Sequence, residues 1–244
     1  MSTLKTSLIA AYCPTLGKTG YTVVDRTGRG QHASLTNAAT DDWFDDRGFT
    51  SLRFDGGSGI ATVTRLFENP PSWSVTWWQN LDALNNSQTL VSFGSTDLWF
   101  HAPYNTNLCY YSKRADIRPT ISATAGAWQH VAIVETGAVG KLYFNGVFIA
   151  DFTGGSAGVI GGKTFQFGYA VPNVGSSTRY VGDIGIFRRA LTAPEIWQLY
   201  QSGRGGLGQL LTPQRRNYAF SVPAAAVKSY LFTNRGQVIG GGTL

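Results

Sequence analysis

Acidic side chains are the first candidates for chemistry, because retaining glycoside hydrolysis needs two carboxyl groups about 5 Å apart. The sequence contains no alternating run of acids that would set such a pair on one strand. The pairs Asp41-Asp42 and Asp45-Asp46 flank two aromatic residues in a segment predicted to be a loop. Adjacent carboxylates in a loop are typical of a solvated turn. We therefore assign no catalytic residue and predict that the protein is not an enzyme.

Histidine and cysteine positions give no pattern for a zinc site. His32, His101 and His130 lack partners at the spacings that zinc requires, and Cys13 and Cys109 form no C-x-x-C motif. We predict that both cysteines are buried as small hydrophobic residues and that His130 packs within a strand.

Two glycine-rich motifs match catalytic patterns in their spacing alone. Residues 154–158 fit G-x-S-x-G, and residues 157–164 approach a phosphate-binding loop. Both patterns need a helix after the loop, whereas Thr164 begins the strand-like run TFQFGY. We interpret both as parts of a glycine-rich connection.

The stretch Leu98 to Tyr111 interleaves aromatic and amide side chains. Aromatic faces beside fixed polar groups are what a sugar site requires. The alternative is that these aromatic rings belong to the core, with a polar turn at Asn105. The predicted ligand-binding residues are Trp99, His101, Tyr104, Asn105, Asn107 and Tyr110.

Short strand-like runs between Gly, Asn, Asp and Ser clusters must position these side chains. Residues 72–78 alternate, which places Trp73, Val75 and Trp77 on one face of a strand. Residues 128–135 have apolar side chains on both faces, which indicates a central strand. Asn145-Gly146 predicts a type I′ hairpin turn, because both residues accept positive φ.

One short helix is expected near the end of these strands. Thr192 and Glu195 form a capping-box pattern, apolar residues then recur at helical spacing, and Gly203 is placed to end the helix. Beyond Gly203 the composition changes, so we predict a domain over residues 1–203 and an arm over 204–244.

Composition and charge limit the class of protein. Of 244 residues, 43% are hydrophobic and only 14% charged, and 30 are glycine, which favours strands and tight turns. No apolar run is long enough for a membrane span. Residues 1–203 carry 15 basic and 14 acidic residues, so the net charge of +6 lies almost entirely in the arm, which has no acid.

In their order along residues 7–203, these segments resemble the laminin G-like jelly roll of the concanavalin A-like lectin/glucanase superfamily. The resemblance rests on LIAAYCP, VVDRTGRGQHASLTN, LRFDGGSGIATV, WSVTWWQN, WQHVAIVETG, KLYFNGVFIADF and YVGDIGIFRRALTAPEIWQLY. It implies an all-β fold, an antiparallel two-sheet jelly-roll β-sandwich with one short C-terminal helix and an extended C-terminal arm. Because this superfamily includes lectins, adhesion modules, glycosidases and spacers, it does not fix the function.

Related domains often bind a structural Ca²⁺ ion where an Asp-x-x-Gly-x-Gly loop meets an acid of the closing strand. In this sequence the resemblance points to Asp25 and Asp183 as calcium ligands. The alternative is that Asp25 organises its own turn. We expect no other cofactor.

The basic arm carries no RNA-binding motif and no stacking platform, so nucleic acid is not an expected partner. We predict instead that the arm contacts neighbouring protein subunits, in a homo-oligomer or a larger assembly. The residues expected to take part are Arg215, Arg216, Tyr218, Phe220, Tyr230 and Phe232.

The N-terminus shows no convincing export signal, although a lectin-like domain normally works outside a cell. A virion component resolves this conflict, because it is made in the host cytoplasm and then displayed. We predict a non-catalytic binding module, a phage-type surface or decoration protein at the virion surface that contacts glycan or protein. The alternatives are a purely structural subunit, an extracellular carbohydrate-binding or adhesion protein, and a glycoside hydrolase-related enzyme.

Overall fold

The structure is a computed structural model, and it forms two units, Met1–Thr212 and Pro213–Leu244. It describes residues 3–36, 42–54, 60–64, 66, 68–84, 89–94, 98–104, 108–111, 123–137, 139–152, 160–168, 178–211, 230–232 and 238–240. Within these ranges the side chains of 89–90, 98–104, 108–111, 230–232 and 238–240 are not described. The first unit ends at Thr212 rather than at the predicted Gly203, because residues 204–211 pack on the sandwich.

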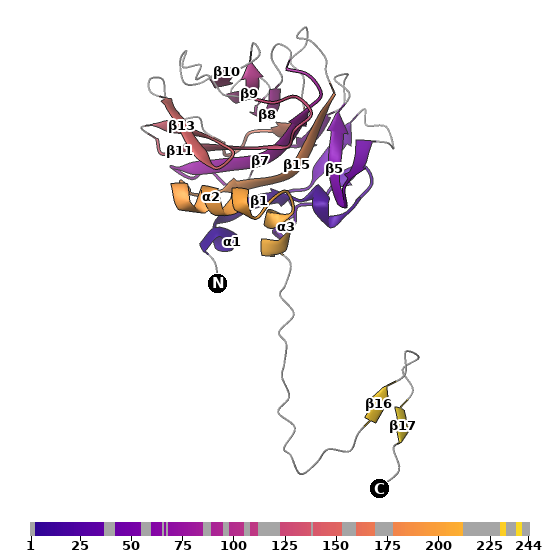
Figure 1. The fold of residues 1–244 in the computed structure, drawn as a ribbon. Coiled ribbons are helices and arrows are strands. Elements are labelled where there is room, and N and C mark those ends of the chain that lie inside the picture. Colours follow the sequence, from indigo (N-terminus) through magenta and orange to yellow (C-terminus); the bar gives the residue numbers. More distant parts are fainter. Residues whose placement is uncertain are drawn as a thin grey trace. The chain divides into compact units, whose positions relative to one another are not determined.

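Two antiparallel sheets form the sandwich, as predicted (Figure 1). The eight-stranded sheet has the order β13 (Val147–Phe152), β12 (Gly140–Phe144), β11 (Gln129–Glu135), β7 (Trp73–Leu81), β15 (Arg179–Phe187), β5 (Phe49–Phe54) and β4 (Trp43–Asp46), and β1 (Leu8–Tyr12) also pairs with β15. The seven-stranded sheet has the order β10 (Leu108–Tyr111), β9 (Leu98–Tyr104), β8 (Thr89–Phe93), β14 (Phe165–Phe167), β6 (Ile60–Val63), β3 (Ala33–Thr36) and β2 (Thr22–Val23).

Strand β7 shows how alternation builds the core. Trp73, Val75 and Trp77 share one face of β7, as predicted, and join one large apolar cluster between the sheets. Ser74 points the other way, where its hydroxyl donates to the Arg189 carbonyl and accepts from the Leu191 amide. Because both faces of β7 are covered, nearly all of its residues are buried.

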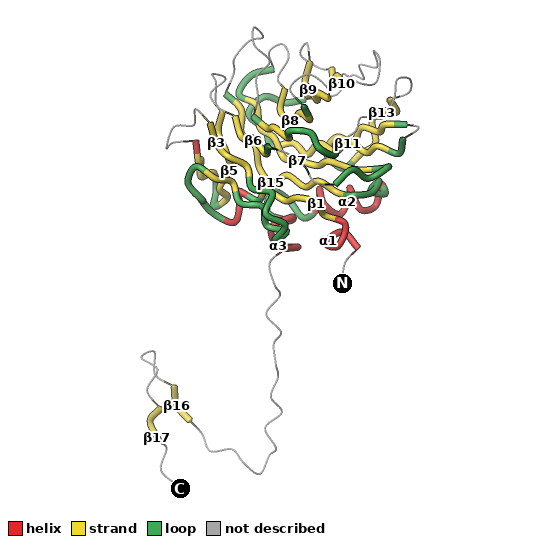
Figure 2. Tube along the Cα trace, turned by 180° about the vertical axis from the view of Figure 1, so that it is seen from behind, coloured by secondary structure: helices red, strands yellow, loops and turns green. Residues whose placement is uncertain are grey.

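Short helices cover the outer face of the eight-stranded sheet (Figures 1 and 2). They are α1 (Thr3–Ser7), α2 (Ala193–Gln201) and α3 (Gly206–Leu211), with a 3₁₀ turn at Pro14–Leu16. A second apolar cluster lies beneath them and includes Leu8, Ala132 and Leu199. The sequence predicted α2 alone, and α1 and α3 are too short to show a helical period.

The ends of α2 follow the prediction. Glu195 accepts a hydrogen bond from the Thr192 amide at 2.9 Å, which completes the capping box. Arg189 holds the same carboxylate through both of its terminal nitrogens, and this hydrogen bonding is the main reason that the pKa of Glu195 falls to about 2. Gly203 follows the helix with a φ of +72°.

The Asn145-Gly146 turn joins β12 to β13, with both residues at positive φ, as the sequence predicts. Gly146 is needed for a second reason. A Cβ atom there would lie 2.7 Å from the Trp197 ring and 2.9 Å from the Tyr200 ring, because α2 packs directly on the turn.

The predicted loop around Asp45 and Asp46 is wrong, because Trp43–Asp46 forms strand β4 and pairs with β5. Arg47 and Gly48 make the connecting turn at positive φ. The Trp43 indole is buried and donates to the Gly20 carbonyl, so it fixes this hairpin to the sandwich.

The second unit has one described element, a hairpin of β16 (Tyr230–Phe232) and β17 (Val238–Gly240). Tyr230 and Phe232, both predicted assembly residues, lie on β16. Arg215, Arg216, Tyr218 and Phe220 lie outside the described residues.

Candidate functional site

A groove opens on the outer face of the eight-stranded sheet, at the end that the helices leave uncovered. Its floor is a row of side chains from three neighbouring segments. Tyr180 of β15 lies opposite Asn80 of β7, and Trp128 immediately precedes β11, which pairs with β7. The groove has a volume of about 580 Å³, which lies in the range of small-molecule sites. Its main lining residues are Phe44, Asp46, Asn80, Asp82, Trp128, Tyr180 and Arg204.

Aromatic rings form one wall of the groove. Phe44 is 39% exposed, and its ring centroid lies 4.8 Å from that of Tyr180 at a tilt of 46°. Phe44 reaches this position because alternation on β4 turns it outward while Trp43 turns inward. A pair of this kind, with Phe44 exposed and Tyr180 half-buried, can pack against the apolar face of a planar or ring-shaped ligand.

Arg204 closes one end of the groove. Its guanidinium lies between the Trp128 and Phe49 rings, 4.5 and 4.8 Å from their centroids. It also donates to Asp46 Oδ2 at 3.1 Å, and the Trp128 indole nitrogen donates to the same oxygen at 3.0 Å. Desolvation by these neighbours lowers the pKa of Arg204, although Asp46 opposes that effect.

Two polar side chains line the groove beside the rings. Asn80 Nδ2 lies 3.4 Å from the Gly126 carbonyl, a weak hydrogen bond, and Asn80 Oδ1 is buried, without a partner within the described part of the chain. Asp82 follows β7 and is exposed, and its backbone amide donates to Thr178. The groove therefore combines ring faces with hydrogen-bonding groups, as sugar sites do.

A β-bulge explains the shape of the sheet beside the groove. Gly182 and Asp183 of β15 together lie opposite one residue of β7, Trp78. A Cβ atom at Gly182 would lie 3.0 Å from the Trp78 Cβ atom, a tight contact, and 3.4 Å from the Trp128 ring. Beyond the bulge, β15 exchanges β5 for β1 as its neighbour.

Asp183 is buried at this junction, where it joins three elements. Its carboxylate accepts a hydrogen bond from the Thr15 hydroxyl at 2.6 Å and from the Gly208 amide of α3 at 3.1 Å. Burial raises the pKa of Asp183 to about 7, even though these hydrogen bonds favour the charged form. Asp183 therefore anchors α3 to the sheet.

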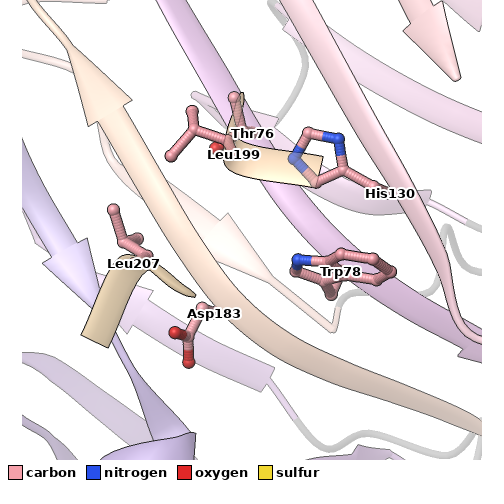
Figure 3. A pocket seen from close by; sticks show the side chains of 6 residues that line it. All are labelled: Thr76, Trp78, His130, Asp183, Leu199 and Leu207. Atoms are coloured by element: carbon pink, nitrogen blue, oxygen red, sulfur yellow. The ribbon is translucent and has the colours of Figure 1, made fainter. Parts of the chain in front are cut away.

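A small cavity lies beneath the helices, between Asp183 and His130 (Figure 3). Its volume of about 10 Å³ is enough for at most one water molecule. Burial lowers the pKa of His130 to about 3, and His130 Nδ1 has no partner among the described residues. This histidine packs in a strand, as predicted, and the cavity is too small for an organic ligand.

The two predicted calcium ligands lie in separate hydrogen-bond networks near Cys13. Burial, followed by the charges of Asp183 and Asp25, raises the pKa of the Cys13 thiol. Asp25 organises its own turn, because its carboxylate accepts from the amides of Ala11, Thr27 and Gln31. Gly28 and Gly30 adopt positive φ in the same loop.

These surroundings do not fit a calcium ion, which needs six to eight oxygen ligands rather than N–H donors. The described residues contain no group of three or more His, Cys, Asp or Glu that could hold a metal. Calcium binding at Asp25 and Asp183 stays a prediction that metal analysis before and after chelation would test.

The predicted sugar-binding stretch falls mostly outside what the structure describes. The backbones of Trp99, His101 and Tyr104 lie on β9, and that of Tyr110 lies on β10, at the edge of the seven-stranded sheet. Their side chains are not described, and Asn105 and Asn107 lie outside the described residues. A sugar site there stays a prediction.

Sequence reasoning missed the groove for identifiable reasons. Local patterns place Phe44 and Asp46 in a loop and Arg204 in the arm. The alternation on β7 was a usable signal, since it puts Trp78 and Asn80 on the face opposite the core. What joins Asn80 to Phe44 and Arg204 is the pairing of distant strands, which no local pattern reveals.

Residues 54–197, more than half of the chain, match the model of the concanavalin A-like lectin/glucanases superfamily. The chain belongs to this superfamily. The match confirms the predicted laminin G-like resemblance. It also agrees with the two antiparallel sheets described above.

Solved structures with the same fold include binding domains of botulinum neurotoxin. For the serotype D binding domain the TM-score is 0.64 at 16% identity, over 83% of this chain and 53% of that one. For serotype D/C VPI 5993 the TM-score is 0.61 at 18% identity, over 82% and 53%. This chain therefore spans about half the length of those structures.

A Trypanosoma rangeli sialidase in complex with 2,3-difluorosialic acid is also similar, with a TM-score of 0.62 at 16% identity, over 86% of this chain and 34% of the sialidase. No protein of curated function matches the sequence. At these identities the neighbours show the fold alone. Within the described residues, no helix is long and apolar enough to cross a membrane.

Proposed function

We propose that this protein is a non-catalytic binding module whose groove beside Trp128 contacts glycan. The observation that carries the proposal is the pairing of the exposed Phe44 ring with the half-buried Tyr180 ring in a groove that Asn80 and Asp82 also line. Ring faces supply apolar contact, and the amide and carboxylate supply hydrogen-bond partners for hydroxyl groups. Membership of a superfamily that includes lectins supports the same class of ligand.

A non-catalytic role suits the carboxylates of the groove. Asp46 accepts hydrogen bonds from Arg204 and Trp128, which hold it as an ion-paired structural group. This engagement leaves Asp82 as the exposed acid of the groove, whereas retaining hydrolysis requires a pair. A glycoside hydrolase-related enzyme is the alternative, and the sialidase neighbour is the observation that favours it.

The finer part of the proposal is display at a virion surface, with residues 213–244 making subunit contacts. Support comes from the arm, which is a separate unit with four basic residues and no acid. Many weak sites on one particle would combine into useful avidity through effective concentration. A cellular adhesion protein with the same groove is the alternative.

The test is glycan-array binding by the full chain displayed as a multimer. We expect saturable binding to a defined sugar class, reduced at least tenfold by Phe44→Ala or Tyr180→Ala. Phe148→Ala is the matched control, because Phe148 is a similarly exposed ring, 46% accessible, outside the groove. Melting temperatures verify that each variant is folded.

Three other outcomes would relocate the glycan site or contradict the proposal. Binding that depends on Tyr104 rather than on Phe44 would move the site to the stretch predicted from sequence. An array without any bound glycan would contradict glycan recognition and favour a structural subunit. Product release from a bound polysaccharide would contradict the non-catalytic role.

A further inference from the structure

The charges around the groove indicate what kind of glycan it accepts, an inference that rests on the proposed function. Among the described residues, two arginines and two aspartates line the groove, so their charges sum to zero. These four charges differ, however, in whether another charged group already engages them. Both arginines interact with Asp46, whereas Asp82 stands apart from them.

Arg204 cannot serve as a receptor for an anion without losing its present contacts. Its side chain is only 12% exposed, because two aromatic rings cover the faces of the guanidinium. Its NH1 and NH2 groups donate to the Asp46 carboxylate and to the Asp46 carbonyl. An incoming carboxylate would have to displace a charge-assisted hydrogen bond that already exists.

Arg47 is also directed at Asp46, with its Nε atom 3.8 Å from Oδ1. Its side chain is 90% exposed, so water screens its charge. Arg47 stands at positive φ in the turn after β4, at the tip of the hairpin. An exposed arginine at a hairpin tip gives little attraction for an anion bound on the floor of the groove.

Asp82 is the charge that a ligand would meet. It is exposed, and no hydrogen bond or ion pair within the described residues engages its carboxylate. A carboxylate accepts hydrogen bonds from hydroxyl groups and repels other carboxylates. Asn80, two residues earlier, adds an amide nitrogen whose hydrogen bond to the Gly126 carbonyl is weak, at 3.4 Å, while its Oδ1 atom is buried.

We propose that the groove selects a neutral oligosaccharide of a few pyranose rings and disfavours glycans with carboxylated sugars. One ring packs on Phe44 and Tyr180, and its hydroxyl groups donate to Asp82 and accept from Asn80 Nδ2. A volume of about 580 Å³ leaves room for more than one sugar ring.

The test compares neutral glycans with carboxylated counterparts. Multimeric full-length protein is applied to immobilised galactotriose and trigalacturonate, which carry a hydroxymethyl group or a carboxylate at the same position of each ring. It is also applied to an array that holds neutral and sialylated forms of each backbone. We expect every bound backbone to be neutral, with its carboxylated form bound at least tenfold more weakly. Raised salt should narrow that difference, because it screens the repulsion from Asp82.

Variants separate the roles of the groove residues. Asp82→Lys should reverse the preference, and Asp82→Ala should weaken neutral binding at least tenfold, since it removes a hydrogen-bond acceptor. Asp151→Ala is the matched control, because Asp151 is also an exposed acid but belongs to an ion pair with Lys141 outside the groove. Asp82 lies beyond the end of β7, so its replacement should leave the fold intact, which the melting temperature verifies.

The failure of this inference can be told apart from the failure of the proposed function. Preferred binding of carboxylated glycans that is lost in Tyr180→Ala would overturn the neutral class while supporting the groove. Neutral binding that no groove variant changes would overturn the groove as the site. An absence of binding to every glycan would overturn both proposals.

Discussion

Arg204 shows how one side chain takes its role from its neighbours. In sequence it is the first charge of a basic segment, and in the structure it lies between two aromatic rings and beside Asp46. Its charge is therefore used to hold β4 and Trp128 in place. The same is true of Asp183, whose carboxyl group holds α3.

The raised pKa of Asp183 predicts a pH dependence. Its folded-state pKa of about 7 lies above its usual value of 3.8, so the folded protein binds the proton more tightly. This group's contribution to stability is present at pH values below about 4 and is lost as the pH rises to about 7. We expect Asp183→Asn to become more stable relative to wild type between pH 5 and pH 8, by about 2 to 3 kcal/mol.

The measurement is denaturant unfolding of both proteins across this range. Comparison with the variant is needed because His130, whose pKa falls to about 3, has the opposite dependence: its unfavourable effect on stability grows as the pH falls below about 6.5. A constant difference between wild type and Asp183→Asn at all pH values would contradict the raised pKa.

At the level of elements, close packing determines where the short helices lie. Helix α2 has a strong capping box, yet its position is set by the rings of Trp197 and Tyr200 against the Asn145-Gly146 turn. Gly182 in the bulge is also closely packed, because a Cβ atom there would lie 3.0 Å from the Trp78 Cβ atom.

Two glycine variants measure this effect. Gly146→Ala should destabilise the protein by about 2 to 4 kcal/mol, because alanine is strained at a φ of +78° and its Cβ atom would overlap Trp197. Gly203→Ala is the matched control, with a φ of +72° and no atom within 4 Å, and should cost about 1 kcal/mol. Equal losses in thermal or denaturant unfolding would show that packing against α2 contributes nothing.

At the level of the whole molecule, the sandwich includes more of the C-terminal region than composition indicates. Leu207 of α3 is buried in the cluster beneath the helices, and α3 also contacts the 3₁₀ turn through Gly208 and Leu16. The glycine-rich segment after Gly203 therefore completes the outer face of the sheet. The arm begins after Thr212.

Two truncations test this division. A chain ending at Thr212 should keep the melting temperature of the full protein while losing self-association, measured by analytical ultracentrifugation. A chain ending at Gly203 should lose about 2 to 5 kcal/mol of stability, because it leaves Asp183 without the Gly208 amide and removes buried Leu207. Unchanged association of the shorter sandwich, residues 1–212, would remove the arm from the proposed assembly role.

Alternation, turn residues and capping signals determined individual strands, one hairpin and one helix from the sequence alone, and the family resemblance implied the jelly-roll class. The pattern of β7, the Asn145-Gly146 turn and the Thr192 cap are local, and each follows from backbone geometry that a short segment specifies by itself. The polar loop of Asp25 belongs with them, since its side chain bonds to nearby amides.

Only the tertiary structure decided where the groove lies. Phe44, Asn80, Tyr180 and Arg204 come from four distant parts of the chain, and strand pairing and the docking of α3 bring them together. Their joint position depends on the register of β15 between β5 and β7 and on the bulge beside it. Non-local pairing of this kind leaves no periodic pattern in the sequence, which is why the site was found in the structure rather than in the sequence.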